Sequence, residues 1–342
     1  MAQILDGKIV RDKIAEKLKA EISSRAKSRD SKPKLVIIQV GDLPESNTYI
    51  RQKILFGQKI GALVDHQKFP ENVSQEKLIT KISSLNTDRK VTGIIVQMPI
   101  PKHLDKDKIV DTINSVKDVD GQTSTNIKLL FEGLSNRNSD PSLRHSERSE
   151  ESRSFDIKSQ DDKEMVSRGF VPATTKGILT LLDFYKIPVE SKHVVIVGRS
   201  SLVGKPTALA LINRDATVTI CHSKTSHLSL ITSHCDILVV ATGRPKLITK
   251  EHVSKGQVVI DVGINVIDDS HPRGEVRTTS ETHPGGVDKP ESEPPARKLV
   301  GDVDFENVSQ IVKAISPVPG GCGPLTVASL FENLLEAYKR QT

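Results

Sequence analysis

The stretch His193-Val-Val-Ile-Val-Gly-Arg-Ser-Ser-Leu-Val-Gly-Lys-Pro206 decides the fold. Its apolar first part has the character of a buried strand, and it runs directly into a turn with small residues at Gly198, Ser200 and Gly204. Pro206 is tolerated in a first helical turn, so a helix is expected next. Because the turn N–H groups and the helix dipole face one point, the stretch predicts an anion site of the dinucleotide-binding type. Its spacing departs from Gly-x-Gly-x-x-Gly, so a turn that serves only packing stays open.

Composition favours a large α/β protein. The 342 residues suit two domains, and hydrophobic residues make up 36% with aromatics only 3%, so the cores consist mainly of Val, Ile and Leu. The 49 basic residues are spread among 43 acidic ones, which argues against a nucleic-acid partner. Apolar runs are too short for a membrane span, and we expect no signal peptide. Three cysteines without a Cys-x-x-Cys pair fit a reducing cytoplasm and predict no metal site.

Strands and helices alternate along the chain, which implies right-handed crossovers and parallel sheets. The first set is expected as helices 7–26, 45–60, 74–85 and 107–113 around strands 35–40, 62–65 and 93–98. The second set is expected as helices 176–185 and 207–212 with strands 194–198, 216–220, 236–241 and 257–262. A final amphipathic helix, 325–339, is expected to pack back on the first set. We therefore predict two parallel-sheet α/β domains.

The predicted domain boundaries follow from this order. Residues 1–125 plus 318–342 form one domain, and residues 126–317 form the other. Within the second domain, segments 135–167 and 268–297 are polar and poor in aliphatic residues. Such segments cannot bury enough apolar surface to offset the entropy lost on ordering, so both are expected to be disordered surface insertions. A role as a binding arm is the alternative.

The residues after the glycine turn favour NADP over NAD. An NAD-binding unit carries an acid at the end of the next strand, roughly 20 residues on, where it holds the ribose hydroxyls. This chain has Cys221-His-Ser-Lys-Thr225 in that place. Arg199, Ser223 and Lys224 offer donors and positive charge that suit a 2′-phosphate, although Lys224 also fits an ordinary surface position.

Two further glycine-containing stretches follow strands of the second domain. Ala241-Thr-Gly-Arg-Pro245 and Asp261-Val-Gly-Ile-Asn265 come at strand ends, the edge where open α/β sheets bind ligands. Turn formation alone would also explain their glycines. The residues assigned to the cofactor site are Gly198, Arg199, Ser200, Gly204, Ser223, Thr242, Gly243, Gly263 and Ile264. Later in the chain, a rigid loop with Pro319, Gly320 and Gly321 exposes backbone at little entropic cost and suits a flat ligand.

In the first domain, Tyr49-Ile-Arg-Gln-Lys53 places an aromatic ring and an amine on one helical face. Two candidate partners end other elements: Gln97 after a strand, and Asp120 in Lys117-Asp-Val-Asp-Gly121. Short-chain dehydrogenases also use Tyr-x-x-x-Lys, but there the pair follows the glycine turn inside the dinucleotide unit. Here it comes long before the turn, which argues against that class. Alone, the pair is weak evidence for a site.

Together these stretches resemble the bifunctional methylenetetrahydrofolate dehydrogenase/methenyltetrahydrofolate cyclohydrolase family. The motifs that carry the resemblance are Asn47-Thr-Tyr-Ile-Arg-Gln-Lys53, Val96-Gln-Met-Pro-Ile-Pro101, Lys117-Asp-Val-Asp-Gly121, Gly198-Arg-Ser-Ser-Leu-Val-Gly-Lys-Pro206, Ile260-Asp-Val-Gly-Ile-Asn265 and Pro317-Val-Pro-Gly-Gly321. The resemblance implies a catalytic folate-binding domain, a Rossmann-type NADP-binding domain, a cleft between them, and a homodimer joined through the nucleotide-binding domains. The implied reaction oxidises 5,10-methylenetetrahydrofolate with NADP and hydrolyses the methenyl product to 10-formyltetrahydrofolate, in one-carbon metabolism.

The resemblance also implies residue roles. Lys53 takes the central catalytic role, since water must attack the methenyl cation and needs a proton acceptor. An amine can accept that proton only if burial or a neighbour lowers its pKa. Gln97 is expected to orient Lys53, Tyr49 to stack on or position the folate, and Asp120 to accept from the pterin N–H groups. The loop residues Pro319, Gly320 and Gly321 complete the predicted substrate site.

The chain departs from the family pattern at several positions. Pro172-Ala-Thr-Thr-Lys-Gly177 lacks the family's cysteine and second proline, Gln122 replaces an aromatic residue, and Lys128 replaces a glycine. These changes leave the four predicted catalytic residues, Tyr49, Lys53, Gln97 and Asp120, intact. They put the efficiency of the interdomain region in doubt. Two alternatives therefore stay open: an enzyme that retains only the dehydrogenase step, and a degenerate NADP-binding protein with a structural role.

Overall fold

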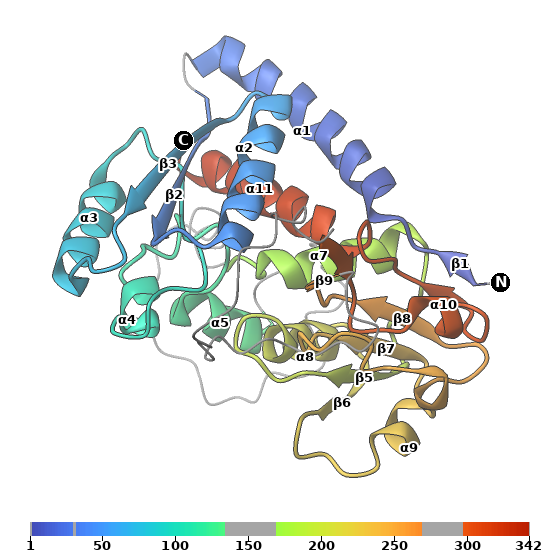
Figure 1. Cartoon of the computed structure of the whole chain (residues 1–342). Coiled ribbons are helices and arrows are strands. Elements are labelled where there is room, and N and C mark those ends of the chain that lie inside the picture. The colour runs from blue at the N-terminus through green and yellow to red at the C-terminus, as the bar shows by residue number, and fades with distance from the viewer. Residues whose placement is uncertain (1, 30–31, 134–168, 269–296, 342) are drawn as a thin grey trace, which may run out of the picture.

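The computed structural model describes residues 2–29, 32–133, 169–268 and 297–341. They form two parallel sheets with helices between and around them (Figure 1). The predicted insertions lie almost wholly outside the described residues; only their end positions, 268 and 297, fall within them. In the described ranges, no helix combines the length and apolarity needed to cross a bilayer. The predicted two-sheet α/β class is confirmed.

The first sheet has the strand order β3-β2-β4, and both pairings are parallel. Its elements are α1 (Gly7–Arg29), β2 (Lys34–Val40), α2 (Pro44–Ile60), β3 (Leu63–Phe69), α3 (Gln75–Thr87), β4 (Gly93–Val96) and α4 (Lys106–Asp111). The central strand β2 is buried on both faces after its first residue, which explains its continuous apolar run. β3 is an edge strand with exposed polar positions at His66 and Lys68. It runs four residues beyond the predicted end at Asp65, to Phe69, and these residues continue the pairing with β2.

The second sheet has the order β1-β11-β8-β7-β5-β6, and all its pairings are parallel. Its strands are β1 (Gln3–Ile4), β5 (His193–Val197), β6 (Thr217–Cys221), β7 (Ile237–Val240), β8 (Val258–Asp261) and β11 (Ala314–Ile315). The helices of this part are α5 (Ser124–Phe131), α7 (Ala173–Phe184), α8 (Gly204–Ile212), α9 (Leu228–Thr232), α10 (Phe305–Val308) and the 3₁₀ turn η3 (Lys250–His252). β9 (Asn265–Asp268) and β10 (Arg297–Val300) form an antiparallel pair beside the sheet.

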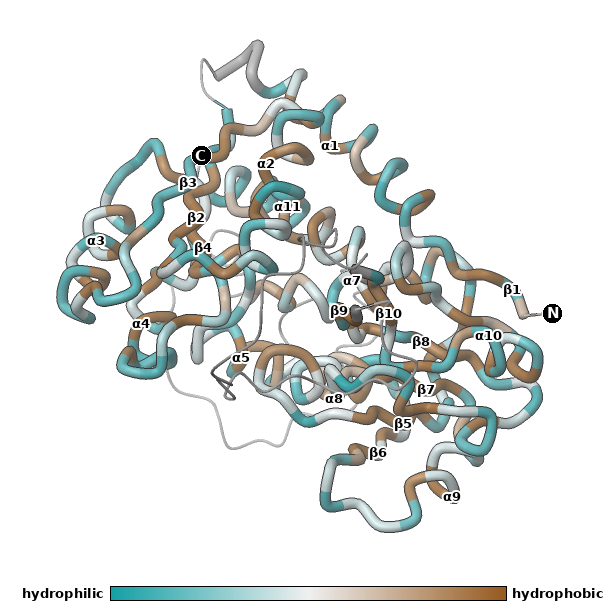
Figure 2. The backbone as a smooth tube through the Cα atoms, viewed as in Figure 1, coloured by the Kyte–Doolittle hydropathy of each residue, from teal (hydrophilic) through white to brown (hydrophobic). Residues whose placement is uncertain are grey.

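The C-terminal helix α11 (Cys322–Arg340) joins the two parts. It packs against α1 and α2, as predicted, and also along α7 (Figure 1). Phe331 on α11 is fully buried and contacts Phe56 of α2, with ring centroids 5.3 Å apart. Apolar residues from both sheets and from α1, α2 and α7 meet around α11 in one of three buried clusters of the described residues. Figure 2 shows the strands β2 and β5 as mainly hydrophobic.

The first strand of the chain pairs outside the first sheet. Gln3 and Ile4 pair with Ala314 and Ile315, so β1 extends the second sheet, although residues 1–125 are predicted to belong to the first domain. Two residues are too few to show a periodic pattern, and the partner strand lies at the other end of the chain, so the sequence does not indicate this pairing. The domain boundaries stay predictions.

Candidate active site

A lysine–glutamine pair lies where α2 faces the end of β4. Lys53 Nζ donates to Gln97 Oε1 at 2.8 Å. The Gln97 amide group cannot turn freely, because its Nε2 donates to the Met98 carbonyl at 2.9 Å. The Gln97 N–H donates to the Ile38 carbonyl, which extends the strand ladder by one residue. The pair therefore presents the lysine amine in one fixed orientation.

Asp120 completes this polar group. Burial lowers the pKa of Lys53, while the nearby Asp120 carboxylate raises it in part. Burial raises the pKa of Asp120, against the lowering effect of Lys53, and Asp118 raises it further. An amine whose pKa is lowered by burial is a competent proton acceptor closer to neutral pH than a free lysine.

The loop that carries Asp120 is fixed by a buried acid. Asp118 accepts hydrogen bonds from the Thr123 N–H at 2.7 Å and from Asn126 Nδ2 at 2.8 Å. The Asp120 carbonyl accepts from the Ala173 N–H at 3.2 Å, which ties the loop to the first turn of α7. Sequence reasoning assigned no function to Asp118 or Asn126, although Asp118 lies within the motif Lys117–Gly121 and Asn126 follows it.

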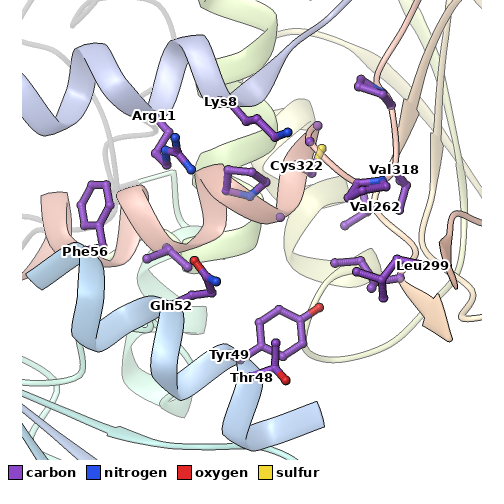
Figure 3. A pocket seen from close by; sticks show the side chains of 18 of the residues that line it. Lys8, Arg11, Thr48, Tyr49, Gln52, Phe56, Val262, Leu299, Val318 and Cys322 are labelled. Atoms are coloured by element: carbon purple, nitrogen blue, oxygen red, sulfur yellow. The ribbon is translucent and has the colours of Figure 1, made fainter. Parts of the chain in front are cut away.

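Tyr49, one turn before Lys53, lies on the wall of a cavity of about 790 Å³ (Figure 3). Burial raises the pKa of its hydroxyl. The predicted loop Pro319–Gly321 forms part of the same wall, as does Ile264. The residues that line this cavity do not include Lys53, Gln97 or Asp120. The structure therefore brings Tyr49 together with the proline–glycine loop, and Lys53 together with Gln97 and Asp120.

The glycine turn between β5 and α8 is tightly packed. Gly198 has a φ of 130°, and a Cβ there would overlap the Ala241 carbonyl oxygen. A Cβ at Gly204 would overlap the Gly198 carbonyl. Ser200 Oγ accepts from the N–H groups of Val203 and Gly204, at 3.1 and 3.4 Å. The two glycines are thus required by the backbone itself, and the Ser200 hydroxyl ties the turn to the start of α8.

The predicted 2′-phosphate residues lie at the carboxyl ends of neighbouring strands. Arg199 follows β5, and Ser223 and Lys224 follow β6; all three are exposed. The Lys224 N–H donates to His222 Nδ1 at 3.1 Å, which shapes this turn. Their donors face solvent at the edge where α/β sheets bind nucleotides.

The strand-end residues Thr242 and Gly243 have a partner that sequence reasoning missed. Asp302, fully buried, accepts from the N–H groups of both and from Thr242 Oγ1. Their N–H groups are therefore occupied within the protein. Asp302 lies in Leu299-Val-Gly-Asp302, where a glycine and an acid directly follow the last two residues of β10, both apolar. That pattern is the signal that would have found it.

Asp261, at the end of β8, is a second buried acid near the cavity. It accepts from the N–H groups of Gly263, Asp302 and Val303. Burial raises its pKa to about 7 from the ordinary value of 3.8. Burial also raises the pKa of the Cys322 thiol to about 12, and the Asp261 charge adds to this effect.

The pKa of Asp261 predicts how stability depends on pH. Between about pH 4 and pH 7 the Asp261 carboxyl is ionised in the unfolded chain but still protonated in the folded one. The free energy of unfolding therefore falls as pH rises, by on the order of 1.4 kcal/mol per pH unit. Above about pH 7 the carboxyl is ionised in both states and the effect is complete. Asp261→Asn should remove this dependence. Urea unfolding of both proteins at several pH values measures it; a constant stability difference between them would contradict the prediction.

Comparison with known proteins agrees with this geometry. The family model of the tetrahydrofolate dehydrogenase/cyclohydrolase catalytic domain matches residues 5–120, and the model of its NAD(P)-binding domain matches residues 172–342. The chain belongs to the tetrahydrofolate dehydrogenase/cyclohydrolase family. A bifunctional FolD protein of Acholeplasma laidlawii is 39% identical over 338 residues, covering 99% of each chain. One from Rickettsia massiliae is 37% identical over 339 residues, covering 99% of this chain and 97% of the relative.

Solved structures of the family superpose on the whole chain. The bifunctional FolD enzyme of Campylobacter jejuni gives a TM-score of 0.78 at 36% identity, covering 99% of this chain and 100% of that one. The Trypanosoma brucei enzyme gives 0.80 at 30% identity, covering 99% and 98%, and that structure is a complex with the NADP cofactor and an inhibitor. The resemblance read from the motifs is thus confirmed.

Three of the departures from the family pattern, Gln122, Ala173 and Thr175, lie near the loop after Asp120 and the first turn of α7. Gln122 Nε2 donates to the Leu202 carbonyl in the glycine turn at 3.4 Å. Thr175 and Thr207 share a buried hydrogen bond of 3.1 Å between α7 and α8. Ala173 reaches Asp120 only through its backbone N–H, which any residue except proline supplies. The substituted side chains therefore make contacts that fit this fold. Lys128 is exposed on α5.

Proposed function

We propose that the chain oxidises 5,10-methylenetetrahydrofolate with NADP and then hydrolyses the methenyl product to 10-formyltetrahydrofolate. The observation that carries the proposal is the Lys53–Gln97 pair beside Asp120, an amine of lowered pKa held in one orientation. Family membership over nearly the whole chain supports both activities. NADP, when bound, accepts the hydride that leaves the methylene carbon.

The side chains of the site bind the folate and accept the proton in the hydrolysis step. In the cyclohydrolase step, neutral Lys53 accepts a proton from the water that attacks the methenyl cation, and Gln97 keeps the amine aimed at that water. Asp120 accepts from the pterin N–H groups and so fixes the folate ring. Tyr49, on the cavity wall, packs against the folate. The loop Pro319–Gly321 also lines this cavity.

The glycine turn fits a dinucleotide. Gly198 and Gly204 allow close contact between the turn, the start of α8 and the residue after β7, which suits a dinucleotide turn with the pyrophosphate near the N-terminus of α8. Arg199 and Ser223 supply donors for a 2′-phosphate at neighbouring strand ends. The exposed Lys224 adds positive charge there. This combination favours NADP over NAD.

One assay tests the proposal against both alternatives. The purified chain is given 5,10-methylenetetrahydrofolate with NADP or NAD, and the reduced cofactor and the methenyl product are followed together. We expect reduced cofactor, preferentially with NADP, and a methenyl signal that decays. Reduced cofactor with a persistent methenyl signal would support an enzyme limited to the dehydrogenase step. If no cofactor is reduced, the chain is a non-catalytic NADP-binding protein and the proposal fails.

The coupling of Lys53 and Asp120 predicts a shift in the pH profile. The cyclohydrolase rate should rise with pH as Lys53 loses its proton. Because the Asp120 charge raises the pKa of Lys53, Asp120→Asn should move this limb of the profile to lower pH, in addition to weakening folate binding. Rates with saturating methenyl substrate across the pH range measure the shift. A limb that stays in place or moves to higher pH would contradict the assignment of Lys53 as the base.

We also propose a cytoplasmic homodimer joined through the NADP-binding domains. β6 is the outer strand of its sheet, and its Ile220 is exposed. Phe131 on α5 and Ile212 on α8 are 71% and 52% exposed, and these helices are neighbours. An open strand edge with apolar side chains nearby suits pairing with a second copy. Light scattering would give the mass of a monomer if the dimer proposal is wrong.

All three cysteines are buried and unpaired, which fits a reducing compartment.

A further inference from the structure

Two buried carboxylates occupy the strand ends beside the predicted cofactor site. Asp302 is 0% exposed, and one of its oxygens accepts from the Thr242 N–H at 2.6 Å, Thr242 Oγ1 at 2.9 Å and the Gly243 N–H at 3.0 Å. Its other oxygen accepts from Asn265 Nδ2 at 2.9 Å. A single side chain therefore connects the loop after β7 to the start of β9.

Asp261 in turn binds the backbone of Asp302 and of the residue after it. Asp261 Oδ1 accepts from the Asp302 N–H at 3.1 Å and from the Gly263 N–H at 3.0 Å, and Oδ2 accepts from the Val303 N–H at 2.9 Å. The Asp261 N–H donates to Ser316 Oγ at 2.8 Å. In the described ranges the ion-paired side chains include neither acid, so neutral donors hold both. Such burial is costly unless every oxygen is satisfied.

Two glycines are shaped around these carboxylates. A Cβ on Gly263 would overlap the Asp302 carboxyl group, and a Cβ on Gly301 would overlap Asp261 Oδ2. Val262 and Ile264, which flank Gly263, line the cavity that also contains Tyr49 (Figure 3 labels Val262 and Tyr49). Asp261 itself lines this cavity, and the Asp302 carboxyl group lies against Gly263, between the two lining residues Val262 and Ile264.

We propose that Asp302, seated by Asp261, is a positioning residue for the dehydrogenase step: it holds the backbone of residues 242–243 and 263–265 in the arrangement that receives the nicotinamide half of NADP. The inference rests on the proposed function and deepens it. Asp302 touches neither substrate nor reacting atoms; it acts through the backbone groups that it binds. Its loss should therefore affect NADP binding and hydride transfer more than the cyclohydrolase step, which uses Lys53 in the other domain.

Asp302→Asn tests this role. The amide keeps the shape of the side chain, but its NH₂ group would face N–H groups that now donate to the carboxylate. We expect the Kd for NADP, by calorimetry, and the KM for NADP to rise roughly ten- to a hundred-fold. Cyclohydrolase activity, assayed with methenyl substrate and no cofactor, should fall far less. The matched control is Asp304→Asn, two residues on, whose carboxylate accepts from Asn307. The control should leave both measurements unchanged.

Gly263→Ala provides a second variant that keeps both acids. Its methyl group would displace the Asp302 carboxylate, so NADP affinity should fall in the same way while cyclohydrolase activity persists. If Asp302→Asn does not fold, this variant decides. Equal losses of both activities, or an unchanged Kd for NADP, would overturn the proposal. A wild-type chain that lacks both activities would instead reject the proposed function, so the two failures are distinguishable.

Discussion

Replacing Lys53 by methionine should lower the cyclohydrolase rate by roughly 10²–10⁴-fold, the usual loss when a general base is removed. Methionine keeps the length and the apolar stem of lysine, so the burial of α2 is preserved. It removes the amine that donates to Gln97 and that is to accept a proton from water. The measurement is the decay of methenyl substrate without cofactor, with calorimetry to show that NADP still binds.

A matched control lies on the same helix. Arg51 is exposed on α2, so Arg51→Met removes a positive charge two residues away without touching the Gln97 pair. The control should keep the wild-type rate. A Lys53→Met protein with full cyclohydrolase activity would remove the basis for the assignment of Lys53.

Gly198→Ala should be among the most damaging single changes in the NADP-binding domain. The added methyl group would meet the Ala241 carbonyl in a conformation with φ of 130°. Backbone strain of about 1–2 kcal/mol and overpacking of about 1–3 kcal/mol predict that the free energy of unfolding falls by about 2–5 kcal/mol. The affinity for NADP should also fall. Urea unfolding and calorimetry with NADP measure both.

Gly256 provides the matched comparison. It also has a positive φ, 95°, but no atom beyond its chain neighbours lies within 4 Å of its added Cβ. Gly256→Ala should therefore cost only the strain, about 1–2 kcal/mol, and leave NADP binding intact. If the two variants behave alike, the crowding at the turn is not what makes Gly198 necessary.

Much of the fold was predictable because its signals are local. The apolar runs of β2 and β5 are buried on both faces, and Gly198 and Gly204 mark a turn whose geometry excludes side chains. The final helix α11 was found from its apolar stripe, and its packing on α1 and α2 followed from chain order. These features depend on residues close together in sequence.

The missed features depend on residues far apart. Nothing near Gln3 indicates its pairing with Ala314, and nothing near Thr242 indicates Asp302 as its partner. The sequence motifs pointed to Thr242 and Gly243 as direct cofactor ligands, yet their N–H groups already donate to Asp302. Their direct contact with NADP, and the roles of the other site residues, stay predictions.

The central claim is that Lys53 and the nicotinamide of NADP serve one folate from opposite sides of the cleft, because Lys53 lies on α2 beside the first sheet and the glycine turn follows β5 of the second. A crystal structure of the chain with NADP and a non-reactive folate analogue tests it most directly. We predict the folate ring beside Tyr49, with the nicotinamide and Lys53 Nζ both about 3–3.5 Å from the atoms on which they act. A folate ring bound away from Lys53, or a nicotinamide on the same side as Lys53, would contradict the account.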